Sequence, residues 1–94
     1  MELLDINAAE ALASAEVSRL GDGVGIEFGL ITDKTLAVES GWVFFFNTVE
    51  FIKTRNFSAT LAGNGPIFVT TSGVLHHLPS ATPWEVALKE LQGR

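Results

Sequence analysis

The stretch LAGNGPIFV, from Leu61 to Val69, places two glycines around an asparagine, a composition that can cradle a phosphate or an oxyanion. A phosphate loop opens into a helix and is usually followed by Lys and by Ser or Thr. Here Pro66 and a β-rich run follow instead. Proline is favoured at the first residue of a strand, and glycine tolerates the extended backbone required before proline. We therefore predict that residues 63–66 form a turn that delivers a strand.

The two histidines, His76 and His77, are neighbours in a predicted strand, so their side chains point to opposite faces and cannot share a metal ion. The chain has no cysteine, which excludes thiolate catalysis and cysteine-based zinc sites. No G-x-S-x-G motif occurs, whereas eleven acids leave a carboxylate-pair hydrolase as the remaining catalytic alternative. Because no catalytic constellation is matched, we expect a protein that is not an enzyme and binds no metal or cofactor.

Hydrophobic periodicity and capping residues predict seven elements that would position these side chains. The first is a helix that begins with the capping pair Asn7 and Glu10 and ends at the glycines of residues 21–23. The others, in chain order, are a strand over 24–30, a strand over 41–46, a short helix from Asn47, two hairpin strands over 66–70 and 73–78, and a helix from Thr82 to Gly93. Short connections favour a single α+β domain over residues 1–94, a four-stranded antiparallel sheet with helices packed on one face, in the order α-β-β-α-β-β-α.

Charge is unevenly distributed along the chain. Residues 1–50 have a net charge of −7 and residues 51–94 a net charge of +2, which gives −5 overall. Such a chain repels nucleic acid and anionic membranes and attracts a basic protein, although an acidic surface that only maintains solubility is the alternative. We expect Glu10, Glu16 and Glu27 to contribute to binding a basic partner. An acidic start and the absence of a membrane-length apolar stretch predict a cytoplasmic location.

The face of the sheet away from the helices is the second predicted binding surface. In the strand over 41–46, three large aromatic side chains make the better core, so we place them inward: Trp42, Phe44 and Phe46. Val43 and Phe45 then point outward together with Phe68, because the helices of a two-layer domain cover one side of the sheet. We expect this apolar patch beside Glu27 to bind a partner protein or a second copy of the chain, which would form a homodimer.

The stretch from Gly41 to Gly73 resembles the small bacterial immunity proteins called immunity protein 35, also described as the YrhB-type domain. The matching residues are, in order, Gly41, Trp42, Phe44, Asn47, Phe51, Thr54, Leu61, Ala62, Gly63, Asn64, Gly65 and Pro66. This strong part covers about a third of the chain, whereas the first and last helices agree with the pattern in order only. The chain departs from the family pattern at Arg55–Asn56, in the turn after the strand and at Ser80. These departures lie in turns, so they leave the fold intact but make the resemblance less informative about which partner is bound.

The resemblance implies an α+β binding protein that is encoded beside a toxin gene and neutralises the cognate toxin in the producing cell, without catalysis or a cofactor. Some relatives are described as chaperone-like, which implies an alternative: a stress protein that holds exposed apolar segments of its clients. The acidic first half suits the immunity interpretation if the toxin is basic, as nucleases tend to be. The aromatic face suits both interpretations.

Overall fold

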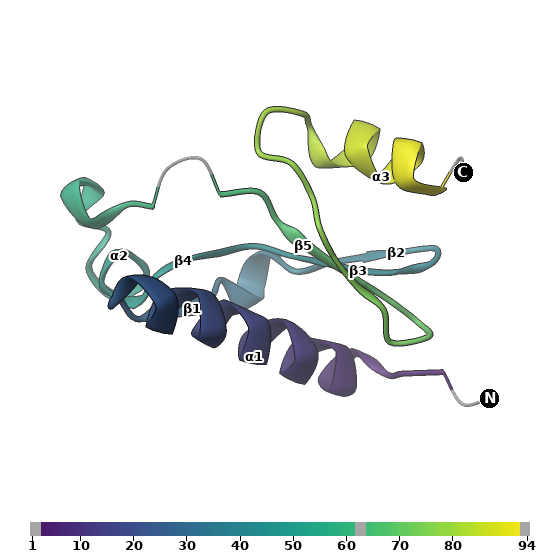
Figure 1. The fold of residues 1–94 in the computed structure, drawn as a ribbon, viewed down its shortest axis with the longest axis horizontal. Helices are drawn as coiled ribbons and strands as arrows, with labels where there is room; N and C mark the ends of the chain where they lie inside the picture. The colour runs from purple at the N-terminus through teal and green to yellow at the C-terminus, as the bar shows by residue number, and fades with distance from the viewer. Residues whose placement is uncertain (1–2, 62–63, 93–94) are drawn as a thin grey trace.

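A computed structural model of the chain, which describes residues 3–61 and 64–92, places antiparallel strands between two helices on opposite sides (Figure 1). The strands form a four-stranded sheet in the order β2-β3-β5-β6 and a two-stranded sheet of β1 and β4. These elements confirm the predicted α+β class. In chain order they are α1 (Ile6–Val24), β1 (Phe28–Leu30), η1 (Thr32–Lys34), β2 (Leu36–Val38), β3 (Gly41–Phe44), β4 (Phe46–Thr48), α2 (Val49–Thr54), η2 (Phe57–Ala59), β5 (Ile67–Thr70), β6 (Leu75–His77) and α3 (Trp84–Gln92).

The predicted strand over 41–46 is divided at Phe45 into β3 and β4, which belong to different sheets. Through Gly41–Phe44 the chain pairs with both β2 and β5, and through Phe46–Thr48 it pairs with β1. The hairpin β5–β6 turns through Gly73, whose φ of 92° suits a residue without a Cβ. The predicted hairpin is therefore confirmed, whereas β2 is an additional edge strand.

Helix α1 ends later than the glycines of residues 21–23 suggest. It continues to Val24, and Gly25 closes it in the left-handed conformation with φ 73°. Gly21 is buried within the helix, where a Cβ would overlap the backbone oxygen of Ile26. Glycine at this position therefore lets the returning chain pack directly against α1. At the other end Asp5, rather than Asn7, is the N-cap, and its carboxylate accepts a hydrogen bond from the Ala8 N–H at 2.9 Å.

One core lies between α1 and the sheet. The buried side of α1 is lined by Ala9, Ala13 and Val17. These small side chains pack against the inward residues of β3, β4 and β5, which are Phe44, Phe46, Ile67 and Val69, with Trp42 at the margin. The predicted inward register of the aromatic strand is therefore confirmed.

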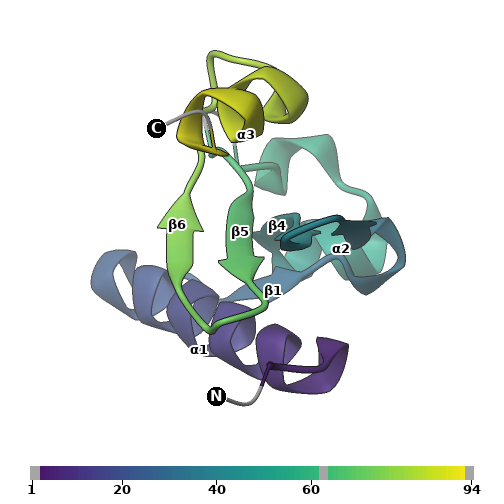
Figure 2. The ribbon, with the colours of Figure 1, turned by 90° about the vertical axis from the view of Figure 1, so that its right-hand side faces the viewer.

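A second core lies on the opposite face of the sheet, under α3 (Figure 2). Val43 and Phe68 are 0% and 2% exposed there, against Ala87 and Leu88 of the helix. Phe45 is half-buried at the margin of the same cluster. The expectation that all helices pack on one face is wrong, because the apolar stripe of α3 covers the outward side of β3 and β5. Val43 and Phe68 accordingly do not form an exposed patch, and a partner could reach them only by displacing α3.

Candidate functional site

Two asparagines of the family-like motif link β4 to residues that lie between α2 and β5. The Asn47 side-chain oxygen accepts hydrogen bonds from the N–H groups of Thr48 and Leu61, both at 2.8 Å. The Asn64 amide donates to the Phe46 carbonyl at 2.8 Å. These hydrogen bonds thus hold Leu61 and Asn64 against β4. The N-cap of α2 is Thr48 rather than the expected Asn47, because the Thr48 hydroxyl accepts from the Phe51 N–H at 3.0 Å.

The stretch considered as a phosphate cradle leads into a strand, as predicted. Strand β5 begins directly after Pro66, and the Pro66 carbonyl accepts a hydrogen bond from the Leu78 N–H at 2.9 Å. A Cβ at Gly65 would overlap the backbone of Leu78 and Pro79, so glycine is needed for this close approach of two chain segments. Gly63, the first glycine of the predicted turn, and Gly93, the predicted end of the last helix, lie outside the described residues.

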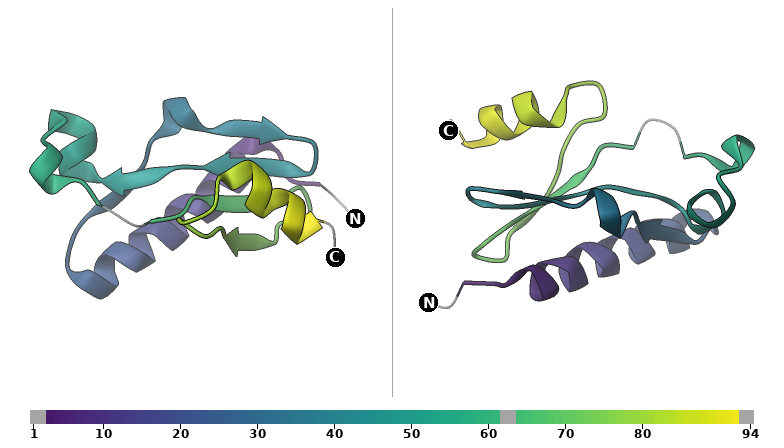
Figure 3. Two further views of the ribbon diagram at one scale, coloured as in Figure 1. Left: turned by 90° about the horizontal axis from the view of Figure 1, so that it is seen from above. Right: turned by 180° about the vertical axis from the view of Figure 1, so that it is seen from behind.

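The C-terminal end of α1 carries two grooves that share a ridge made by Ile26 and Leu61. The first groove, of about 660 Å³, runs between the ridge and α2 and includes Glu27 and Glu50. The second groove, of about 590 Å³, lies on the other side of the ridge, between the end of α1 and the chain around Leu78. Figure 1 places this end of α1 beside α2, away from both labelled chain termini, and the rear view in Figure 3 agrees. We call this region the α1-end surface.

Large apolar side chains are exposed at the α1-end surface. Val24 and Ile26, which line the grooves, are 61% and 50% exposed, and Phe57, next to the groove-lining Ser58, is 82% exposed. The Phe57 ring lies 5.9 Å from the ring of Phe51, and the Arg55 guanidinium stands 5.6 Å from the Phe51 ring centre. The alternating pattern of residues 24–30 predicts a half-buried strand with Val24 and Ile26 on its inward face. This is wrong for both residues, because α1 continues through Val24 and β1 begins only at Phe28. The glycines at positions 21, 23 and 25 could have indicated this exposure from the sequence, since any of them could end the helix and leave the next residues exposed.

The three acids predicted to bind a partner lie at separate places. Glu10 and Glu16 are six residues apart on α1, which puts them on different sides of the helix. Glu10 lines a shallow hollow with Thr32, whereas Glu16 faces β6. Glu27 alone belongs to the α1-end surface, where Glu50, Lys53 and the ridge surround it.

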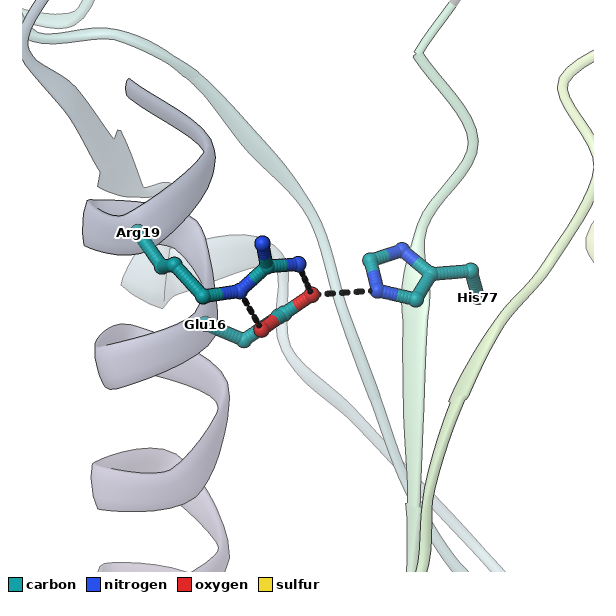
Figure 4. Close-up of polar contacts among 3 residues, drawn as sticks. All are labelled: Glu16, Arg19 and His77. Carbon is teal, nitrogen blue, oxygen red and sulfur yellow. Dashed lines mark hydrogen bonds and ion pairs between the residues drawn. The ribbon is translucent and has the colours of Figure 1, made fainter. Parts of the chain in front are cut away.

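Glu16 is the centre of a polar cluster that joins α1 to β6 (Figure 4). Arg19 donates hydrogen bonds from Nε and Nη2 to the two carboxylate oxygens of Glu16, at 2.8 and 2.6 Å. His77 Nε2 lies 2.6 Å from Glu16 Oε2. The hydrogen bonds from Arg19 are the largest cause that lowers the pKa of Glu16 from 4.5 to about 2; burial opposes them, and the hydrogen bond from His77 lowers the pKa by a smaller amount. Glu16 is thus engaged within the chain, so its predicted role as a steering charge loses its basis.

The histidines diverge as predicted. His76 stacks on the Phe68 ring, with centroids 6.0 Å apart, on the α3 side of the sheet, whereas His77 reaches Glu16 on the α1 side. Across residues 3–61 and 64–92, no group of three or more His, Cys, Asp or Glu side chains is arranged to hold a metal ion. Of the helices in the described ranges, none combines the length and the apolar character needed to cross a bilayer.

We predict that acid weakens the link between Glu16 and its partners. The folded-state pKa of Glu16 lies below its ordinary value of 4.5, so its contribution is complete above about pH 4.5 and is lost as the pH falls toward 2. Glu16→Gln should therefore lower the urea midpoint at pH 7, and the difference from the natural chain should shrink at pH 3. Glu10→Gln, on the same helix, is the control. A Glu16→Gln deficit that is as large at pH 3 as at pH 7 would contradict this role.

The structure is an α+β fold of two antiparallel sheets with helices on both sides, and exposed apolar side chains gathered at one end of such a molecule commonly mark an interaction surface. The family model of Immunity protein 35 matches residues 7–90, and the chain belongs to this family. The uncharacterized protein YrhB of Escherichia coli (strain K12) is 40% identical over 53 residues, which make up 55% of this chain and 56% of YrhB. The chain thus aligns with just over half the length of that relative. No solved structure matches.

Membership in the Immunity protein 35 family supports a role in immunity in general. The match extends well beyond the third of the chain that carries the motif, and it includes α1 and most of α3.

Proposed function

We propose that the chain neutralises one cognate toxin domain in the cytoplasm of the cell that produces the toxin, by binding it without chemical turnover. The family match over residues 7–90 carries this proposal. The exposed Ile26 side chain on the ridge supports the proposal, because large apolar side chains on a protein surface commonly mark an interface. The match gives no support to the chaperone-like alternative.

A protein that neutralises a toxin by binding needs only to cover the surface through which the toxin acts. A stable protein–protein interface buries roughly 1,200–2,000 Å² in total, with a few central apolar anchors supplying most of the affinity. The α1-end surface offers such anchors on a backbone that the Asn47 and Asn64 hydrogen bonds hold in place. A surface ordered before binding loses little conformational entropy on association.

The proposal is tested in cells by co-expression. The chain is produced together with the toxin domain encoded beside its own gene, and growth is compared with that of cells carrying the toxin domain alone. Restored growth is the expected result. Continued killing, with the chain soluble and in excess, would refute the proposal. If the chain also restored the growth of cells that carry unrelated toxins, a general holding activity would be favoured instead.

We further expect the toxin to be basic, because the chain has a net charge of −5. Charge reversal at Glu10 and Glu27 together should then slow association by about tenfold at low salt and flatten its salt dependence, with a smaller effect on dissociation. Glu85→Lys on α3 combined with Glu90→Lys gives a control with the same change in net charge. An association rate that does not vary between 20 and 150 mM salt, roughly a threefold change in Debye length, would remove the electrostatic part of the proposal.

A further inference from the structure

The α1-end surface has a distribution of charge that selects its partner. Glu27 and Glu50 both line the first groove, where Lys53 is the only basic side chain among the described lining residues. Both ion pairs found within residues 3–61 and 64–92 involve Glu16, so neither Glu27 nor Glu50 has a cation bound to it there. Among the described residues, the Glu50 carboxylate accepts one hydrogen bond, a long one of 3.4 Å from the Asn56 amide.

The C-terminus of α1 adds to this negative potential. The last turn of α1 contains Asp22 and no basic residue, so the partial negative charge of the helix end is not compensated locally. Arg19, the nearest cation on the helix, is already bidentate to Glu16. An apolar ridge with an acidic rim therefore stands at this end of the molecule.

We propose that the α1-end surface is where the toxin docks, and that the toxin presents a protruding apolar side chain flanked by Lys or Arg. This inference rests on the proposed function. The apolar side chain lies against Ile26 and Leu61 in one of the two grooves, and the cation sits between Glu27 and Glu50. The ridge is fixed for this purpose, because the Ile26 N–H donates to the Gly21 carbonyl at 3.0 Å and the Leu61 N–H donates to Asn47 at 2.8 Å.

Charge also decides between a toxin and a second copy of the chain. A symmetric contact of two copies through this surface would place two copies of its acidic rim in one interface, each with two carboxylates, Glu27 and Glu50, and one lysine, Lys53. Like charges at an interface oppose association, and each copy already has a net charge of −5. A basic partner removes this repulsion, so the surface is complementary to such a partner and not to itself.

The test compares matched double variants in binding to the purified toxin domain encoded beside the chain's gene. The first variant is Ile26→Ser with Glu27→Lys, in the α1-end surface. The control is Val86→Ser with Glu85→Lys on α3, since Val86 is 46% exposed and Ile26 is 50% exposed. Thermal melts confirm that both variants fold, which the exposure of all four side chains favours.

We expect the first variant to raise Kd by about 100-fold or more and the control to change Kd by less than about threefold. Equal binding by both variants, while the natural chain binds tightly, would overturn the docking surface and leave the proposed function standing. Failure of the natural chain to bind would overturn both. Light scattering tests the alternative of a homodimer. If the natural chain is a dimer and the first variant is a monomer, the surface joins two copies of the chain, and this result would also overturn the inference.

Discussion

Phe68→Ala is expected to lower the free energy of unfolding by about 3–5 kcal/mol, because it removes a ring from the centre of a closed core. The Phe68 side chain is 2% exposed between β5 and α3, where Val43 and Leu88 belong to the same cluster. A domain of this size is stable by roughly 5–14 kcal/mol. The variant should therefore unfold at a much lower urea concentration, as measured by circular dichroism.

Phe57→Ala is the matched control for this change. The same atoms are removed, but the Phe57 ring is 82% exposed, so the free energy of unfolding should change by about 0.5 kcal/mol or less. If Phe68→Ala costs less than about 1 kcal/mol, α3 does not cover this face of the sheet as described.

Gly65→Ala is expected to destabilise the domain by about 1–3 kcal/mol through overpacking. A methyl group at this position would overlap the carbonyl group of Leu78, and a backbone group cannot rotate away as the end of a flexible side chain can. The effect is steric, because positive φ among the described glycines is found at Gly25 and Gly73 and not at Gly65. The segment after β6 would have to move, together with the hydrogen bond between Leu78 and Pro66.

Gly23→Ala makes the same chemical change where, apart from the adjoining residues and the backbone of α1 itself, nothing lies within 4 Å of the new methyl group. Gly23 is inside α1, so alanine should stabilise the domain by about 0.5–1 kcal/mol. Thermal melts of both variants would show opposite shifts. A Gly65→Ala protein that melts at the temperature of the natural chain would contradict the close approach of these two segments.

The register of the central strands was predictable from the sequence because it depends on local alternation and side-chain size. Placing Phe44 and Phe46 inward follows from their volume, and the structure agrees. The side of the sheet that α3 covers was not predictable in this way, since it depends on the path of the chain through residues 78–83. The sequence did indicate that both faces of this strand are buried, because every residue from Trp42 to Phe46 is apolar.

The candidate site was predictable only in part. The acidic surface follows from composition, and Glu27 lies in it. Glu16 was selected for the same reason, but its partner His77 is 61 residues away in sequence, and no local pattern indicates such a contact. The exposure of Ile26 depends on which of three glycines ends α1, and the close packing of Gly21 against the backbone of Ile26 and Phe28 decides it.

The central claim, neutralisation by binding without turnover, is tested most directly by titrating the chain into the purified toxin domain and measuring the activity of the toxin. We expect activity to fall linearly and to vanish at equimolar chain, with the mass of the toxin unchanged. The slope should match the stoichiometry of the complex in light scattering. Full inactivation by a small fraction of an equivalent would indicate catalysis, and undiminished activity in excess chain would indicate no inhibition; either result would contradict the account.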